Sequence, residues 1–316
     1  METSVTLETS ARIYIAGHNG LVGSALWRHF SKLGFQNLIG WSSKELDLRD
    51  NAATRRAILG AKPECIIMAA AKVGGIKANS SFPVEFLNDN LRIQTNIFEA
   101  AHEANVNKLL FLGSSCVYPK FAQQPIQENS LLTGELESTN SAYAIAKIAG
   151  ILQVQSYRKE YKRNWISAMP TNLYGPNDNF DLQSSHVLPA LIRKFHEAKI
   201  NGVETLDLWG SGTPLREFLH TDDLANACHF LLENYDGDVP INVGWGKDLT
   251  IRDLAGMISE IVKYNGKIKW DSTQPDGTKR KVLDTTLINS LGWKPTVELR
   301  DGIKSTYAWF QESYSN

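Results

Sequence analysis

The sequence predicts an α/β protein built on a parallel sheet with helices on both faces. Short apolar segments alternate with longer amphipathic segments from residue 12 to residue 170. Continuous apolar runs are typical of strands buried on both faces, and helices between them provide the crossovers of a parallel sheet. The expected strands are residues 12–16, 37–41, 64–70, 108–113 and 165–170.

Amphipathic segments of helical length fill the gaps between these strands. The alternation of strands and helices ends at Pro170. Residues 172–185 are rich in Asn, Asp, Gly and Pro, which predicts a long loop, and such loops are often functional. Shorter elements separated by Gly and Pro are expected in the rest of the chain. The expected helices are residues 21–33, 51–59, 83–103, 141–162 and 186–199.

The composition is that of a globular protein with almost no net charge. The 316 residues carry a formal net charge of −1, so no broad attraction to nucleic acid or to an anionic membrane is expected. The three cysteines are an odd number without a C-x-x-C pair, which argues against a disulfide framework and a metal site. Residues 1–10 do not resemble a signal peptide and no apolar stretch approaches the roughly 18 residues of a membrane span, so we expect a cytoplasmic protein.

A glycine-rich turn directly follows the first expected strand. Gly17, Gly20 and Gly23 have the spacing G-x-x-G-x-x-G and open the next helix. Glycines there let the backbone turn tightly and approach a pyrophosphate, while the helix N-terminus offers N–H groups to the phosphates. This position predicts a Rossmann-type doubly wound parallel sheet that binds a dinucleotide; a purely structural turn is the alternative.

The chain length suits this domain together with a smaller lobe. We expect residues 1–174 to form the dinucleotide-binding Rossmann domain. Residues 175–316 are expected to form mainly a smaller α/β substrate-binding lobe, with part of 216–245 returning to the first domain.

The end of the second expected strand bears on the choice between NAD and NADP. An Asp or Glu at that point holds the free 2′-hydroxyl of NAD. The segment Gly40-Trp41-Ser42-Ser43-Lys44 has no carboxylate, and its two hydroxyls and lysine suit a 2′-phosphate, although it has no arginine. The sequence therefore favours NADP(H), with NAD(H) or a solvated turn as alternatives. Residues 47–50 have two possible roles: they can cap the N-terminus of the next helix, or they can contact the adenine of the cofactor.

Tyr143 and Lys147 stand four residues apart in the helix expected at 141–162, so their side chains face the same side. A nearby cation stabilises a phenolate, so Lys147 is expected to lower the pKa of Tyr143 from about 10 and make it a usable acid or base. Y-x-x-x-K is common by chance. Ser114 strengthens the pattern because it follows the fourth strand, at the edge where parallel-sheet sites form, and can bond the same substrate oxygen.

Longer segments carry a family resemblance. They are residues 17–23, 71–76, 113–119, 143–150, 169–180, 185–190, 209–223 and 275–277. Together they resemble the extended short-chain dehydrogenase/reductases that act on nucleoside-diphosphate sugars, and within that superfamily the GDP-L-fucose synthase family, over nearly the whole chain. Dehydratase relatives carry an Asp-Glu pair where this chain has Ser115 and Cys116. A cysteine there suits removal of a proton from a carbon beside a ketone.

The resemblance implies NADP(H)-dependent 3,5-epimerisation and 4-reduction of GDP-4-keto-6-deoxy-D-mannose to GDP-L-fucose. It implies Cys116 as the base and His186 as the acid on opposite faces of the ketosugar. It further implies that Tyr143 protonates the new hydroxyl, that Lys147 also holds the nicotinamide ribose, and that Ser114 orients the C4 oxygen. Without the resemblance, Cys116 would more often be a packing residue and His186 the start of a helix.

The glycine loop, the strand ends and the resemblance together define the expected cofactor site. Asn19 and Trp41 depart from relatives, which carry arginines there toward the 2′-phosphate. The expected cofactor-binding residues are Gly17, His18, Asn19, Gly20, Leu21, Val22, Gly23, Trp41, Ser42, Ser43, Lys44, Leu46, Leu112, Gly113, Ser114, Ser115, Tyr143, Lys147, Pro170, Thr171, Asn172, Leu173 and His186.

A nucleoside diphosphate sugar needs cations on its pyrophosphate, and the planar fork of Arg216 suits phosphate oxygens. Lys194 stands where relatives usually have an arginine. Trp209 can pack on the ligand or in the core, and Lys281 can reach the phosphates or belong to a solvated basic turn. The expected substrate-binding residues are Lys194, Trp209, Arg216, Asp276 and Lys281.

Two other functions stay open at this point. One is an NAD-dependent nucleotide-sugar 4-epimerase of the same superfamily, against which Cys116 and His186 argue. The other is a non-enzymatic dinucleotide-binding sensor, against which the intact Tyr143 and Lys147 argue. The resemblance also implies a homodimer, because relatives use the helices corresponding to 83–103 and 141–162 for a four-helix interface.

Overall fold

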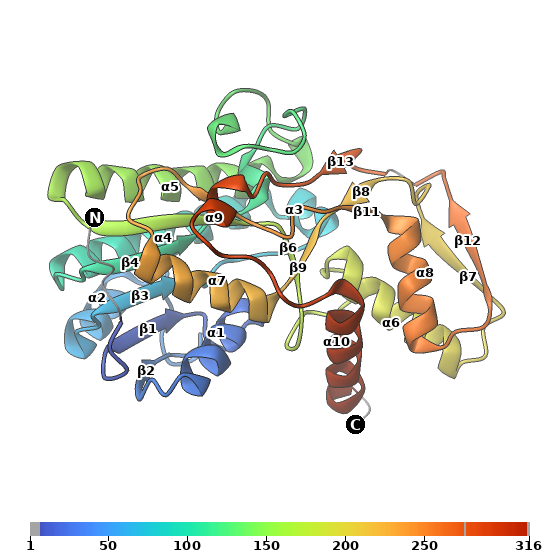
Figure 1. Ribbon diagram of the computed structural model, residues 1–316, viewed down its shortest axis with the longest axis horizontal. Coiled ribbons are helices and arrows are strands. Elements are labelled where there is room, and N and C mark those ends of the chain that lie inside the picture. Colours follow the sequence, from blue (N-terminus) through green and yellow to red (C-terminus); the bar gives the residue numbers. More distant parts are fainter. Residues whose placement is uncertain (1–6, 275, 315–316) are drawn as a thin grey trace.

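A computed structural model describes residues 7–274 and 276–314 (Figure 1). The predictions that concern residues 1–6 and Pro275 lie outside the described residues. A six-stranded parallel sheet forms the centre of the larger lobe, in the order β2-β1-β3-β4-β5-β10. Its strands are β1 (Arg12–Ala16), β2 (Asn37–Ile39), β3 (Cys65–Met68), β4 (Lys108–Leu112), β5 (Asn164–Pro170) and β10 (Ile241–Val243).

This topology confirms the predicted doubly wound sheet. The chain passes from β1 to β2 on one side and then returns to β3 on the other side of β1. In open α/β sheets, ligands bind beyond the carboxyl ends of the strands where the order reverses in this way. The ends of β1, β3 and β4 therefore define the region in which a site is expected.

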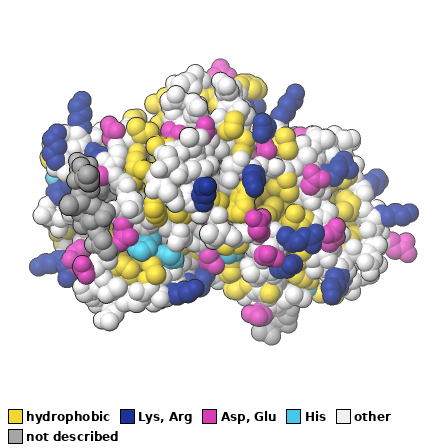
Figure 2. Space-filling view, in the orientation of Figure 1, with side chains coloured by type: hydrophobic (Ala, Val, Ile, Leu, Met, Phe, Trp, Pro, Cys, Tyr) yellow, Lys and Arg dark blue, Asp and Glu magenta, His cyan; other side chains and the backbone are white. Residues whose placement is uncertain are grey.

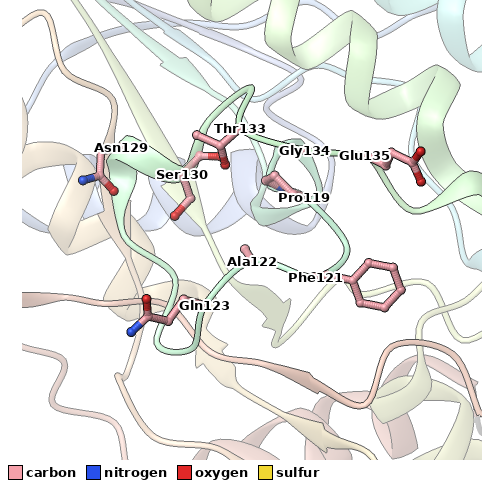
Figure 3. Close-up of a pocket in the computed structure, with 9 residues that line it drawn as sticks. All are labelled: Pro119, Phe121, Ala122, Gln123, Asn129, Ser130, Thr133, Gly134 and Glu135. Carbon is pink, nitrogen blue, oxygen red and sulfur yellow. The ribbon is translucent and has the colours of Figure 1, made fainter.

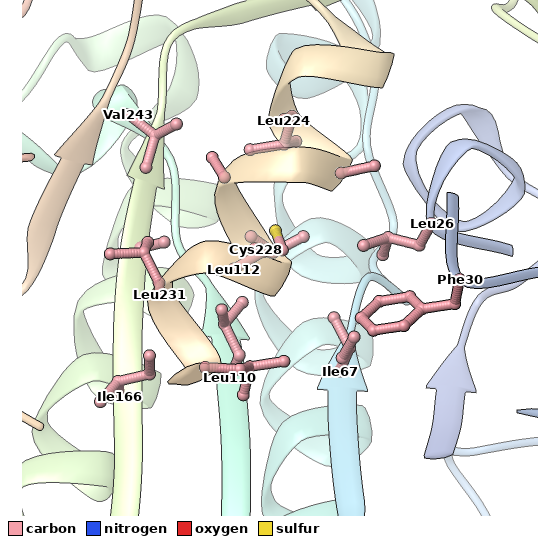
Figure 4. Close-up of a cluster of buried hydrophobic side chains, with 14 of the residues drawn as sticks. Leu26, Phe30, Ile67, Leu110, Leu112, Ile166, Leu224, Cys228, Leu231 and Val243 are labelled. Carbon is pink, nitrogen blue, oxygen red and sulfur yellow. The ribbon is translucent and has the colours of Figure 1, made fainter. Parts of the chain in front are cut away.

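Helices cover both faces of the sheet. α1 (Leu21–Lys32) and α7 (Thr221–Asn234) pack on one face, where Phe30 and Cys228 join a continuous apolar cluster with side chains of β3, β4 and β5 (Figure 4). The other face is covered by α2 (Asn51–Ala61), α4 (Pro83–Glu103) and α5 (Ser141–Tyr161). Asp50 caps α2 by accepting a hydrogen bond from the backbone N–H of Ala53, which confirms the N-cap interpretation.

A glycine allows α5 to approach the sheet closely. A Cβ at Gly150 would lie 2.3 Å from the ring of Phe111 on β4 and 3.0 Å from Oε1 of Gln94 on α4. The missing side chain therefore sets the depth at which α5 packs. Because Tyr143 and Lys147 lie on the same helix, this packing also fixes how far they stand from the end of β4.

The smaller lobe has its own apolar core. α6 (Val187–Ile200), α8 (Ile251–Val262) and α10 (Leu299–Tyr314) contribute to it. β7 (Thr205–Trp209) pairs with β12 (Lys267–Asp271), and β8 (Leu215–Arg216) lies between β11 (Leu249–Thr250) and β13 (Arg280–Lys281). The remaining short helices are α3 (Ile76–Ser81), η1 (Ser115–Val117), η2 (Glu128–Ser130), η3 (Ser138–Asn140) and α9 (Thr286–Ser290).

One sequence prediction is wrong in part at the junction between the lobes. Residues 175–185 form a loop as the composition predicts, but Asn172–Tyr174 form β6, which pairs in parallel with β9 (Phe218–His220). Polar local composition hides this strand, because the pairing partner lies far along the chain. Ile288 and Trp293 also pack into the core of the larger lobe. We propose that the lobes divide near residue 175, with residues 218–243 and 286–293 belonging to the first.

Charges are interspersed over the surface. In Figure 2 the Lys and Arg side chains alternate with Asp and Glu over the visible face, in agreement with the small net charge. Within residues 7–274 and 276–314, no helix has the length and apolar character needed to cross a membrane. The same described residues contain no cluster of three or more His, Cys, Asp or Glu side chains suited to a metal ion.

Candidate active site

The glycine loop has the geometry that a phosphate-binding turn requires. Gly17 has φ +82°, and a Cβ on it would lie 2.8 Å from the backbone of Ala70. A Cβ on Gly23 would lie 2.0 Å from the carbonyl oxygen of Gly17. No larger residue fits either position without movement of the backbone. Gly20 is the N-cap of α1 and offers no side-chain cap, so the N-terminus of this helix can receive an anion.

The segment after β2 lies beside this loop and leads into a carboxylate that no sequence motif indicated. A Cβ at Gly40 would lie 2.5 Å from the ring of His18. The backbone N–H and the hydroxyl of Ser42 both donate to Oε2 of Glu45 at 2.7 Å. Glu45 stands just beyond the segment 40–44, and a turn brings it back. The sequence signal for this turn is the serine three residues before Glu45, because serine side chains hydrogen-bond within turns.

The end of β4 presents Ser114 and Cys116. The hydroxyl oxygen of Ser114 accepts a hydrogen bond from the backbone N–H of Cys116 at 3.2 Å and starts η1. The thiol of Cys116 is partly exposed, and its Sγ receives Nδ2 of Asn140 at 3.3 Å and Nζ of Lys281 at 3.5 Å. Two donors, one of them the ammonium group of a lysine, therefore point at this sulfur. Asn140 was missed because it lies before the Y-x-x-x-K segment and matches no motif.

The other two cysteines differ from Cys116. Cys65 and Cys228 are fully buried in the apolar core. Burial raises the pKa of each thiol to about 12. Both are packing residues, and neither can serve as a base near neutral pH.

Tyr143 and Lys147 lie on the face of α5 that meets the end of β4. Nζ of Lys147 donates to the carbonyl oxygen of Leu112 at 2.8 Å and stands 5.9 Å from the ring centroid of Tyr143. Burial lowers the pKa of Lys147 to about 7. Burial also raises the pKa of Tyr143, the nearby Cys116 raises it further, and a hydrogen bond with Ser114 acts the other way.

The expected lowering of the Tyr143 pKa is therefore wrong for this structure. Desolvation of the phenol is the largest cause of the raised pKa, and the ammonium group of Lys147 is itself desolvated and only partly charged near pH 7. A phenol that keeps its proton is suited to donate it. The arrangement thus favours Tyr143 as an acid toward an oxyanion that forms beside it.

His186 is the N-cap residue of α6 and makes no side-chain cap hydrogen bond. Its side chain is exposed, yet the surrounding protein lowers its pKa through desolvation. Most of the imidazole is therefore neutral at neutral pH. His186 therefore begins α6, as the helix-start interpretation expects, and its ring makes no capping hydrogen bond.

Arg216 and Lys281 are direct neighbours, because β8 and β13 pair with these two residues in register. Burial lowers the pKa of Arg216, while the charges of Asp276 and Cys116 oppose this shift. The carboxylate of Asp276 is engaged, since it accepts from the backbone N–H and the hydroxyl of Ser211 at 2.7 Å. The structure thus gathers two cations beside the thiol, and the solvated interpretation of Lys281 is wrong.

Lys194 and Trp209 form a second pair in the smaller lobe. Nζ of Lys194 lies 5.4 Å from the ring centroid of Trp209, a cation–π contact. The indole is 65% exposed, so the core interpretation of Trp209 is wrong. The exposed indole can stack on the planar base of a nucleotide, and the lysine beside it can bind the phosphates of that nucleotide.

Residues after β5 have a structural task. The hydroxyl of Thr171 and Nδ2 of Asn172 both donate to the carbonyl oxygen of Glu217, at 3.4 and 2.8 Å. The buried carboxylate of Glu217 accepts from the backbone N–H groups of Gly246 and Leu283 at 2.6 and 2.9 Å. This residue lies in segment 209–223 of the family resemblance but had no role assigned there, and it ties the strand that carries Arg216 to the chain that follows β13.

A separate surface pocket lies in the loop that follows η1 (Figure 3). None of its lining residues belongs to the predicted site. They are Pro119, Phe121, Ala122, Gln123, Asn129, Ser130, Thr133, Gly134 and Glu135.

A Rossmann sheet with a glycine loop, and with Ser114, Tyr143 and Lys147 at its carboxyl edge, defines a dinucleotide-dependent dehydrogenase of the short-chain type. Comparison with known proteins makes the class specific. The sequence pattern of the NAD dependent epimerase/dehydratase family matches residues 13–244. The chain belongs to this family.

Its full-length relatives include proteins with a particular activity. The chain is 55% identical to GDP-L-fucose synthase 1 of Arabidopsis thaliana, covering 100% of this chain and 98% of the relative. It is 49% identical to GDP-L-fucose synthase of Escherichia coli (strain K12), over 96% and 97% of the two chains. A solved GDP-L-fucose synthetase from Naegleria fowleri bound to NADP is 29% identical, with a TM-score of 0.92 over 100% of this chain and 98% of that one.

Proposed function

We propose that this protein converts GDP-4-keto-6-deoxy-D-mannose to GDP-L-fucose by inverting C3 and C5 and then reducing C4 with NADPH. The full-length relatives with this name support the proposal. The observation that carries it is the environment of Cys116, a partly exposed thiol with Asn140 and Lys281 on its sulfur, two residues from Ser114 at the carboxyl edge of the sheet. Reduction of a C4 ketone needs no base for a carbon-bound hydrogen, whereas inversion at C3 and C5 does.

The described residues fit a nicotinamide dinucleotide. Side chains at Gly17 and Gly23 would collide with the backbone of Ala70 and of Gly17, so glycines are needed for the tight turn that leads into α1, whose N-terminal N–H groups can receive a pyrophosphate. Ser42, Ser43 and Lys44 would hold the 2′-phosphate of NADP(H), and Lys147 would hold the nicotinamide ribose. When bound, the reduced cofactor supplies the hydride for C4.

Epimerisation needs a base and an acid on opposite faces of the ring. The 4-keto group acidifies the C3 and C5 hydrogens because the carbanion formed is an enolate. Cys116 as thiolate removes each proton, and His186 delivers a proton to the other face. Ser114 and Tyr143 donate hydrogen bonds to the enolate oxygen at C4, where negative charge develops.

Reduction uses the same oxygen. When hydride reaches C4, the carbonyl oxygen becomes an alkoxide, and Tyr143 gives it a proton. The raised pKa of Tyr143 keeps the phenol protonated and ready for this step. Arg216, Lys194 and Trp209 would bind the GDP part and hold the sugar ring in place.

Deuterium exchange tests the assignment directly. In D₂O with the 4-keto substrate and without NADPH, the wild type is expected to incorporate deuterium at C3 and C5, measured by mass spectrometry and NMR. Cys116→Ser should slow incorporation by about a hundredfold or more. Cys228→Ala, at a buried cysteine of α7, is the matched control and should keep it. Full exchange in Cys116→Ser would show that another group is the base.

We infer that the protein is a homodimer through α4 and α5. These helices pack side by side, and they expose large apolar side chains at Val84 (67%), Ile145 (47%) and Leu152 (45%). A twofold axis across this face would bury them in a four-helix interface.

We also infer a cytoplasmic location. The three cysteines, all within the described residues, form no disulfide. This agrees with a reducing compartment.

A further inference from the structure

The turn after β2 holds a carboxylate in a fixed place. Oε2 of Glu45 accepts two hydrogen bonds from Ser42, one from its backbone N–H and one from its hydroxyl, both at 2.7 Å. The backbone N–H groups of Glu45 and Leu46 donate back to the carbonyl oxygen of Ser42, at 3.0 and 2.9 Å. The hydrogen bonds from Ser42 lower the pKa of Glu45, so its carboxylate is charged at neutral pH.

This carboxylate lies beside the phosphate-binding loop. β2 is the neighbour of β1, and the ring of His18 in the loop lies against Gly40 at the end of β2. His18 also acts electrostatically on Glu45. In Rossmann folds, an acidic side chain about 20 residues after the glycine loop accepts a hydrogen bond from the 2′-hydroxyl of the adenosine ribose. Glu45 follows Gly23, the last glycine of the loop, by 22 residues, and its carboxylate carries the charge for that contact.

Few cations lie near Glu45 to attract the 2′-phosphate of NADP(H). Lys44 is the one cation among residues 40–46, and its side chain is exposed. Asn19 in the glycine loop is neutral. Arg49, further along, is engaged by Asp47 and Asp89 at 2.8 and 3.4 Å. Beside Ser42 and Ser43, a 2′-phosphate would therefore meet one exposed lysine and one fixed carboxylate.

We propose that Glu45 and Lys44 are opposing selectivity residues, and that this chain binds NAD(H) as well as NADP(H) at its adenosine-ribose site. Glu45 accepts a hydrogen bond from the 2′-hydroxyl of NAD(H), and Lys44 attracts the 2′-phosphate of NADP(H). The carboxylate repels the phosphate, and because both are exposed, water and salt reduce this repulsion. The inference rests on the dinucleotide site of the proposed function and is independent of its sugar chemistry.

Binding measurements without sugar test the inference. The dissociation constants of NADPH and NADH are measured on the full chain from nicotinamide fluorescence. For the wild type we expect the two to agree within about tenfold, a small preference by the standards of charged-group recognition. Glu45→Gln should weaken NADH and tighten NADPH, changing their ratio by about tenfold in favour of NADPH. Lys44→Gln should change the ratio in the opposite direction.

A matched control and two adverse outcomes complete the test. Glu312→Gln removes an exposed carboxylate from α10 in the other lobe and should leave both constants unchanged. The proposal is overturned if the wild type binds NADPH more than about tenfold tighter than NADH, or if the ratio stays the same in Glu45→Gln. Because these assays contain no sugar, they stand even if deuterium exchange assigns the base to a group other than Cys116.

Discussion

Nζ of Lys281 lies 3.5 Å from Sγ of Cys116, although the two residues are 165 positions apart in the chain. The contact joins the edge of the Rossmann sheet to β13 of the smaller lobe. Lys281 is also the register partner of Arg216, because β13 pairs in parallel with β8. The base proposed for the first half of the reaction is thus completed by a cation from the other lobe.

Replacing this cation should make the thiol less reactive. Lys281→Gln removes the positive charge beside the sulfur, so alkylation of Cys116 by iodoacetamide at neutral pH should slow by several-fold, and deuterium exchange at C3 and C5 with it. Lys279→Gln, at an exposed neighbour, should leave both rates unchanged. Equal alkylation rates in Lys281→Gln and the wild type would refute a role for this lysine at the sulfur.

Tyr143→Phe should separate the two halves of the reaction. The variant lacks the proton for the C4 alkoxide, so NADPH oxidation should fall by roughly 10²- to 10⁴-fold. Because Cys116 and Ser114 remain, deuterium exchange should fall much less. Parallel measurement of both rates checks this, and an equal loss in both would mean that the phenol acts mainly in epimerisation.

The lowered pKa of Lys147 predicts that the stability of the protein depends on pH. Its folded-state pKa of about 7 lies below the ordinary 10.5, so between these pH values the unfolded chain binds more protons and stability rises with pH. Lys147→Met removes this contribution. The free energy of unfolding of the variant minus that of the wild type should therefore be largest at and below pH 7 and should decrease by up to about 1.4 kcal/mol per pH unit above it.

Urea unfolding followed by circular dichroism at pH 6 to 10 measures this difference. The hydrogen bond to Leu112 that the variant loses adds a constant offset, so the slope carries the result. A difference that does not change with pH would show that Lys147 keeps an ordinary pKa in the folded protein.

Two helical glycines should respond in opposite ways to alanine. Gly150→Ala would place a Cβ 2.3 Å from the ring of Phe111, so it should lower the free energy of unfolding by about 1–3 kcal/mol. Gly256→Ala on α8 meets no atom within 4 Å and should raise it by about 0.5–1 kcal/mol, because alanine favours the helix. Urea unfolding of both variants is the measurement. Destabilisation of equal size would mean that close packing of α5 is not the cause.

Charges on α5 should dissociate the proposed dimer. The double variant Ile145→Asp, Leu152→Asp places two carboxylates in the apolar face, so sedimentation and light scattering should give the mass of a monomer. Ile200→Asp, at an exposed apolar residue at the end of α6, should leave the mass unchanged. A wild type that sediments as a monomer would remove the dimer proposal.

Much of the fold could be predicted because its signals are local. The sheet core, the glycine turn before α1 and the helix with Tyr143 and Lys147 follow from residues close together in sequence. The strand β6 could not be predicted, since its hydrogen-bond partner β9 is distant. The pKa of Tyr143 was also mispredicted, because spacing gives the distance to a lysine but not the burial of both groups.

The glycine turn, the Y-x-x-x-K pair and the cysteine after β4 can be recognised from the residues alone, because backbone conformation and helical periodicity act over a few residues. The side chains that complete the site become apparent only in the folded chain. Asn140 and Lys281 reach the sulfur of Cys116, and Glu45 returns to Ser42, through contacts that chain folding creates. Electrostatic interactions and hydrogen bonds depend on distance in space, and no local pattern encodes that distance.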